Sequence, residues 1–505
     1  MQAANKVAFN TFVMYAKMLI TMGISLYSTR LVLNALGATD YGVYMLIAGV
    51  IAMLSFLNSA MATSTLRYFS FYQGKNDLLM QKKVFTNSYI LHIAIAIFVV
   101  MLLLVLIPFL FNGFLNIQPD RIPAARFVYC FMAISVFFSI ISVPFNASIA
   151  AHENMLWLAV IYTIENLLKF AIAISLVMFA QNDRLFIYGL LMSIVALCSF
   201  IIYLTYCKKK YEECHFQWSL DIPLIKELFA FSGWNFYGVL CNIGKIQGLA
   251  VLLNIFGGTI VNAAYGIANQ VSVQLNFFSR TMIGTMNPQI MKSEGMNNRK
   301  RTLRLSMTAS KFGFFLLAFI AVPCIFEMPA ILKIWLNNVP ENTVIFCSLF
   351  LVGALITQLT FGIQSAIQAI GKIKLYQTII GTVLLLNLPI SYILLKFGFP
   401  VYSVMISFVL IEIMASTTQL ILIKKIACLS IKEYFNRVFL REIVPVLLLI
   451  ISCWTITHTL FFDYRFIVTG MVSVIIFAAG IYFTGLCKDE KNLVDKILKK
   501  ILRKT

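Results

Sequence analysis

The chain has 505 residues, of which 60% are hydrophobic and only 12% are charged, so it carries far less charge than a soluble globular domain. Its 40 lysines and arginines against 20 aspartates and glutamates give a formal net charge of +20. Because the basic residues fall at the ends of long apolar runs, this charge indicates membrane topology rather than nucleic-acid binding. The composition therefore predicts an all-α polytopic membrane protein with no nucleic-acid partner.

The apolar runs predict about 14 transmembrane helices, each long enough to cross roughly 30 Å of hydrocarbon. In chain order they cover residues 8–30, 41–65, 87–111, 124–150, 156–180, 185–207, 229–256, 261–289, 306–328, 343–369, 376–396, 401–423, 442–462 and 466–486. The first run lacks a clear small-residue cleavage site, so we expect a retained helix rather than a removed signal.

The lysines and arginines also predict the orientation. With the N-terminus in the cytoplasm, 28 of them lie in cytoplasmic segments, seven lie in outer segments and five lie inside spans. This bias predicts that both termini are cytoplasmic. In the tail, residues 487–505, apolar side chains occupy one helix face and lysines the other, which predicts a basic amphipathic helix on membrane lipids.

The sequence repeats itself at an offset of about 220 residues. LVLNALGATDYGVY (31–44) resembles VLLNIFGGTIVNAAYGI (251–267), with Asn34 and Gly37 opposite Asn254 and Gly257, and three shorter echoes follow in the same order. Each half has an even number of spans, so the two predicted six-helix lobes enter the membrane the same way round, as parallel repeats in transporters do. The predicted divisions are an N-terminal lobe (1–207), a cytoplasmic linker (208–228), a C-terminal lobe (229–423), two additional helices (424–486) and the tail (487–505).

Charged residues inside or at the ends of the spans are candidate site residues, because burying a charge in a bilayer is costly. The cations occur in spans 1, 2, 7 and 8, which are equivalent pairs in the repeat: Lys17, Arg30, Arg67, Lys245 and Arg280. They predict a basic substrate chamber suited to a phosphate. The alternative is that these side chains snorkel to the interface or form local ion pairs.

Three further residues are candidates for ion coupling or ion pairing. Glu165 and Lys169 are four residues apart in one span, so they share a helix face and can pair. Glu412 lies in the middle of span 12 with no cation near it in sequence. It is either held protonated by burial or serves as a proton or sodium site.

Enzyme and metal chemistry find no support in the sequence. The single imitation of a phosphate-binding loop, Gly238 to Lys245, lies in an apolar helix and has no Ser or Thr after the lysine. The four histidines are far apart, and the ten cysteines form no metal or disulfide pattern. We therefore expect no catalytic residue, no metal and no cofactor.

Four segments resemble the signatures of polysaccharide flippases in the multidrug/oligosaccharidyl-lipid/polysaccharide exporter (MOP) superfamily. They are STRLVLNALGATDYGVY (28–44), FSGWNFYGVL (231–240), NAAYGIANQV (262–271) and MIGTMNP (282–288). The resemblance implies a flippase of the bacterial inner membrane that moves an undecaprenyl-pyrophosphate-linked oligosaccharide by alternating access, for O-antigen, capsule or another surface polysaccharide. It also implies polysaccharide polymerase or assembly proteins as partners.

Two alternatives remain at this point. A cation-coupled multidrug or metabolite exporter of the same superfamily would use Glu165 or Glu412 as its ion site. Such exporters usually have twelve spans and acidic cavities, whereas the candidates here are mostly basic. The other alternative is a scaffold for a glycan-assembly complex, which would need none of the buried charges.

Overall fold

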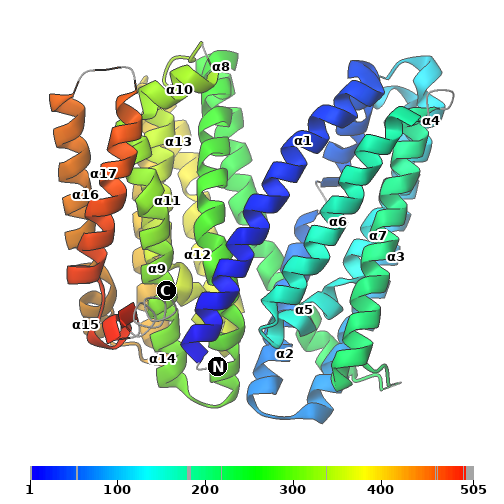
Figure 1. Cartoon of the computed structure of the whole chain (residues 1–505), viewed down its shortest axis with the longest axis horizontal. Helices are drawn as coiled ribbons and strands as arrows, with labels where there is room; N and C mark the ends of the chain where they lie inside the picture. Colours follow the sequence, from blue (N-terminus) through cyan, green and yellow to red (C-terminus); the bar gives the residue numbers. More distant parts are fainter. Residues whose placement is uncertain are drawn as a thin grey trace, which may run out of the picture. The chain divides into compact units, whose positions relative to one another are not determined.

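The computed structural model describes residues 3–52, 55–115, 117–178, 183–217, 219–336, 338–460, 462, 464–492 and 494–495, and these residues are almost entirely helical (Figure 1). The first half contains α1 (Ala3–Ala52), α2 (Ser55–Gly74), α3 (Leu78–Phe109), α4 (Ile122–Ile141), α5 (Val143–Ala151), α6 (Met155–Ser175) and α7 (Arg184–Lys210). The second half contains α8 (Ile222–Gly295), α9 (Arg299–Phe326), α10 (Met328–Leu336), α11 (Thr343–Ile370), α12 (Ile373–Leu385), α13 (Asn387–Lys396) and α14 (Ser403–Ala427). It ends with α15 (Ile431–Tyr434), α16 (Leu440–Thr459) and α17 (Arg465–Gly480).

The helices form two compact units. Residues 5–236 make the N-terminal unit, and residues 237–505 with 1–4 make the C-terminal unit. Each unit has its own apolar core. Val43, Leu103 and Tyr129 belong to the core of the N-terminal unit, and Leu253, Phe346 and Met405 to that of the C-terminal unit. The predicted division into lobes and linker stays a prediction.

Two of the long helices are interrupted at glycines. Among the described residues, 12 helices are long and apolar enough to cross a membrane, and α1 and α8 are two of them. α1 has φ 80° and ψ 166° at Gly37, and α8 has φ 76° and ψ −173° at Gly258. Glycine alone adopts this backbone conformation readily. The expected spans 8–30 and 41–65, and 229–256 and 261–289, lie on either side of these two breaks.

The backbone confirms the internal repeat. Asn76 and Asn297, 221 residues apart, both have positive φ, 54° and 55°. The next residue caps the following helix in each half: the Asp77 side chain accepts from the Met80 N–H, and the Asn298 side chain from the Arg301 N–H, both at 3.0 Å. Capping by Asp or Asn at this position is a strong start signal. The same turn therefore starts α3 and α9.

The register of the repeat differs by one residue from the prediction near the helix break. Gly37 corresponds to Gly258 in conformation, whereas the sequence comparison set it opposite Gly257. The breaks at Gly37 and Gly258 fall in the short gaps between the expected spans 1 and 2 and between spans 7 and 8, and the chain is helical on both sides of each glycine. The predicted amphipathic tail is described only in part: residues 488–492 are helical, and residues 493 and 496–505 lie outside the described part.

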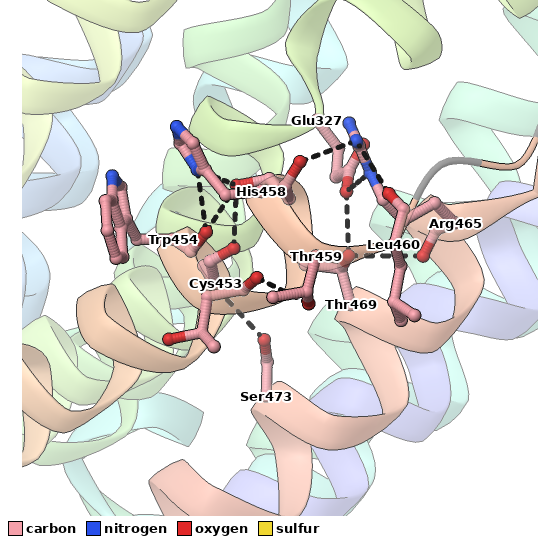
Figure 2. A network of polar contacts seen from close by, with 11 residues as sticks. Glu327, Cys453, Trp454, His458, Thr459, Leu460, Arg465, Thr469 and Ser473 are labelled. Carbon is pink, nitrogen blue, oxygen red and sulfur yellow. Dashed lines mark hydrogen bonds and ion pairs between the residues drawn. The ribbon is translucent and has the colours of Figure 1, made fainter.

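A polar network fastens the additional helices α16 and α17 to the rest of the C-terminal unit (Figure 2). Arg465, at the start of α17, donates from Nε and Nη2 to the two carboxylate oxygens of Glu327, at 2.9 and 3.1 Å. Thr469 donates to the same carboxylate at 2.7 Å. Glu327 follows α9 and is only 2% exposed, so this bidentate pair gives its charge a well-oriented partner.

A second network closes one end of the N-terminal unit. His152, just after α5, contacts Glu213 through Nε2 at 2.7 Å and Gln73 through Nδ1 at 2.8 Å. Its ring stacks on Tyr211, with the ring centres 4.2 Å apart. Lys6, near the start of α1, donates to the His152 carbonyl at 3.2 Å. These contacts join α1, α2, α5 and the segment after α7.

Candidate functional site

A polar cavity of about 480 Å³ opens inside the N-terminal unit. Its wall is formed by α2, α4, α5, α6 and α7 and consists of Asn58, Ser59, Ala62, Thr63, Leu66, Ser139, Ser142, Val143, Asn146, Ala147, Ala150, Tyr162, Glu165, Ala196, Ser199 and Tyr203. The volume falls in the range of small-molecule sites. Most of these residues carry a hydroxyl, amide or carboxyl group, which is unusual for a membrane-spanning bundle.

The polar groups of the cavity are held by one another. The Asn146 amide donates to the hydroxyls of Tyr162 and Tyr203 at 3.1 and 3.5 Å. Asn146 follows Pro144, which lies in the first turn of α5, where the chain passes from α4 to α5. Tyr162 comes from α6 and Tyr203 from α7, so one amide joins three helices. Such an amide and its tyrosines offer both donors and acceptors to a ligand.

The charges around this cavity are more positive than negative. Glu165 is the acidic residue of the described cavity wall, and Lys169 binds it at 2.6 Å. Lys17, from α1, lies with its ammonium 3.8 Å from the centre of the Tyr162 ring, a cation–π contact. Lys169 neutralises the charge of Glu165, so the positive charge of Lys17 gives the surroundings of the cavity a net positive charge. The cavity therefore suits a neutral or anionic ligand better than a cation.

The Glu165–Lys169 pair expected from the sequence is present, and Glu412, which has no cation near it in sequence, has one in space. Glu412 does have a cation, because Lys245 reaches it from α8 at 2.5 Å. Thr357 donates to the other carboxylate oxygen at 3.0 Å, and the Phe408 ring lies 4.7 Å from the ammonium. Lys245 is 3% and Glu412 6% exposed. In this conformation the Lys245 charge faces a carboxylate within the C-terminal unit.

The other three predicted cations lie in different surroundings. Arg67 is buried and surrounded by aromatic rings, 4.4 Å from Tyr68 and 5.2 Å from Phe231. Arg30 and Arg280 are exposed. Lys17, Arg30 and Arg67 belong to the N-terminal unit, and Lys245 and Arg280 to the C-terminal unit. A common chamber formed by all five stays a prediction.

The sequence pattern does not single out the neutral cavity residues, because only charged residues stand out in an apolar span. These residues are Asn146, Tyr162 and Tyr203. One signal was available: Tyr162 and Glu165 are three residues apart in an apolar span and so lie on the same face of α6. Nothing in the sequence pattern connects this face with Asn146 or Tyr203.

Several solved structures share the fold of this chain. A MATE point mutant has a TM-score of 0.73 at 13% identity, over 84% of this chain and 96% of that one. A MOP superfamily transporter from Pyrococcus furiosus, described as having a binding pocket of reverse polarity, has a TM-score of 0.72 at 13% identity with the same coverage. An outward-facing multidrug resistance MATE family transporter of the MOP superfamily has a TM-score of 0.72 at 12% identity, again over 84% and 96%.

No protein-family model and no curated protein sequence matches the chain significantly. The structural likeness defines the class: this is a multi-pass, all-helical membrane protein with the fold of MOP superfamily transporters. At such low identity the likeness shows the fold alone.

Proposed function

We propose that the chain is a transporter that flips a lipid-linked oligosaccharide with a phosphate headgroup across the membrane by alternating access. The observation that carries the proposal is the charge balance of the N-terminal cavity. Lys169 neutralises Glu165, and Lys17 adds a positive charge beside Tyr162. A phosphate-bearing ligand gains from this field, because ion pairs in a low-dielectric site are strong.

The neutral part of the wall supports the same substrate class. Sugar hydroxyls both donate and accept hydrogen bonds. The cavity wall offers matching groups: amides, serine and threonine hydroxyls and two tyrosines. Tyrosine rings also give sugars an apolar face with a polar edge. The volume of about 480 Å³ is large enough for one or two sugar residues and far too small for a polyprenyl tail. The tail would stay in the lipid.

A cation-coupled multidrug or metabolite exporter is the second candidate. Glu165 lines the cavity, and it would become an ion site if Lys169 moved away. Multidrug transport is named for one of the structures that share the fold. In this candidate the carboxylate is essential, whereas in the flippase the cation Lys17 is essential. Single substitutions therefore separate the two.

The test uses the full-length protein in proteoliposomes with two reporters, a labelled undecaprenyl-pyrophosphate-linked saccharide and a cationic drug. We expect Lys17→Met to slow saccharide flipping about 10-fold or more, the equivalent of one charge-assisted hydrogen bond, while Glu165→Gln keeps it. Lys333→Met, an exposed position on α10, is the matched control and should behave as the parent protein. Drug transport that is driven by an ion gradient and lost in Glu165→Gln, without saccharide flipping, would establish the exporter instead.

A further inference from the structure

A buried lysine holds the segment that follows α17. Lys311, in the middle of α9, is 1% exposed and forms an ion pair with Glu490. Its ammonium also lies 3.4 Å from the Gly485 carbonyl and 3.6 Å from the Cys487 sulfur. Glu490 in turn accepts from the Cys487 N–H at 2.8 Å. Lys311 thus fastens the segment 486–492 to α9.

A second carboxylate lies near the same lysine. Glu442, in the first turn of α16, is 2% exposed, and neither of its carboxylate oxygens has a hydrogen-bond partner in the described part of the chain. Gly485, whose carbonyl Lys311 contacts, packs against the Arg441 carbonyl and Pro445, which lie on either side of Glu442 in α16. The docked state therefore holds two buried or nearly buried carboxylates and one ammonium.

The other polar groups near Glu442 are committed elsewhere. Arg441 donates to the Thr484 carbonyl at 3.0 Å, and Arg437 pairs with Glu433 and Asp489. Tyr434 donates to the Leu359 carbonyl at 2.6 Å. Tyr482 donates to Asp495 at 2.8 Å. These groups are paired, so among the described residues Lys311 is the cation we take as the exchangeable partner of Glu442.

One ammonium balances one carboxylate. An ionised carboxylate buried without hydrogen bonds costs several kcal/mol, so it stays neutral unless a cation becomes free. With Glu490 on Lys311, Glu442 must carry a proton. With Glu490 gone, Lys311 can pair with Glu442, and the proton is no longer needed.

We propose that Glu442 is a proton-binding site coupled to the docking of the 486–492 segment, with Glu442 and Glu490 exchanging as partners of Lys311. On release of the segment the Glu442 O–H bond breaks, the proton passes to water and the carboxylate pairs with the Lys311 ammonium. Docking takes up one proton, so acid favours the docked state and rising pH favours release. This inference is independent of the transported substrate.

The test is limited trypsin digestion of the full-length protein in lipid nanodiscs between pH 6 and 9. Mass spectrometry reads cleavage after Lys488 and Lys491, each normalised to cleavage after Lys300, an exposed site at the start of α9 in the same molecule. This ratio removes the pH dependence of the protease. We expect the ratio to rise with pH by up to 10-fold per unit where Glu442 titrates, the slope of one linked proton.

Three variants complete the test. Glu442→Gln, which resembles the protonated acid, should keep the ratio low across the whole range. Glu490→Gln should raise the ratio at every pH, because the segment has lost its ion pair. Asp489→Asn, which removes the exposed pair with Arg437 on the same segment but leaves Lys311, Glu442 and Glu490 intact, is the matched control and should retain the pH response. A flat ratio in the parent protein, or a Glu442→Gln variant that titrates like the parent, would overturn the proposal.

Discussion

Lys245 and Glu412 are 167 residues apart in the chain and are each other's counter-ion inside the C-terminal unit. The pair joins α8 to α14, and Thr357 adds a contact from α11. Its stability depends on both partners being present. A buried charge that loses its partner is far more costly than the intact pair is favourable.

Lys245→Met is therefore expected to lower the free energy of unfolding by about 3–5 kcal/mol, because Glu412 would be left buried without a cation. The double variant Lys245→Met with Glu412→Leu should recover most of this loss, since an apolar pair of similar volume needs no counter-ion. Unfolding of the purified protein in detergent measures both. Equal stability of the single and double variants would show that the two residues are not coupled.

The glycine at each helix break provides a second prediction. Gly258→Ala should cost about 1–3 kcal/mol, because alanine is strained at φ 76° and ψ −173° although an added Cβ would meet no atom within 4 Å. Gly37→Ala should cost a similar amount, since its backbone has nearly the same conformation. Thermal unfolding of the detergent-solubilised variants measures the effect.

Gly266→Ala is the control for the glycine substitutions. It lies in the same helix with ordinary helical geometry, and an added Cβ there also meets nothing within 4 Å. Alanine should stabilise the helix at that position by about 0.5–1 kcal/mol. If both substitutions in α8 had the same sign, backbone strain at Gly258 would not be the cause.

The sequence was sufficient to predict the helical class and the repeat, because apolar length and local capping act over a few residues. The Glu165–Lys169 pair was predictable for the same reason, because two residues four positions apart on a helix share a face. Glu412 is different. Its partner comes from a distant helix, and hydropathy does not encode which faces of two helices meet. The same holds for Asn146, whose contacts with Tyr162 and Tyr203 need three helices to pack first.

The Glu327–Arg465 pair predicts how firmly α16 and α17 are attached. Arg465→Met should reduce stability by about 3–5 kcal/mol, because Glu327 is 2% exposed and would lose its cation. Arg465→Lys should recover only part of the loss, since a lysine cannot form the two-pronged contact. Hydrogen exchange should show the largest increase in α17. Unchanged exchange there in Arg465→Met would mean that packing alone holds these helices.

The contact between His152 and Glu213 predicts a dependence on pH. Burial alone would raise the pKa of Glu213, but the hydrogen bond and charge of His152, together with a backbone N–H and Ser148, outweigh it and hold the pKa below the ordinary 4.5. The unfolded chain then binds more protons than the folded one as the pH falls below that value. The stability contributed by Glu213 is fully present above pH 4.5 and is lost as the pH falls through the folded-state pKa.

Glu213→Gln should therefore be less stable than the parent protein at pH 7, and the difference between the two should shrink only under acid conditions below about pH 4.5. Unfolding of both proteins in detergent at a series of pH values measures this difference. Glu212→Gln is the matched control, because the neighbouring side chain is exposed and should change stability little at any pH. A Glu213→Gln difference that stayed constant down to about pH 3 would mean that the charge of the Glu213 carboxylate contributes nothing to stability.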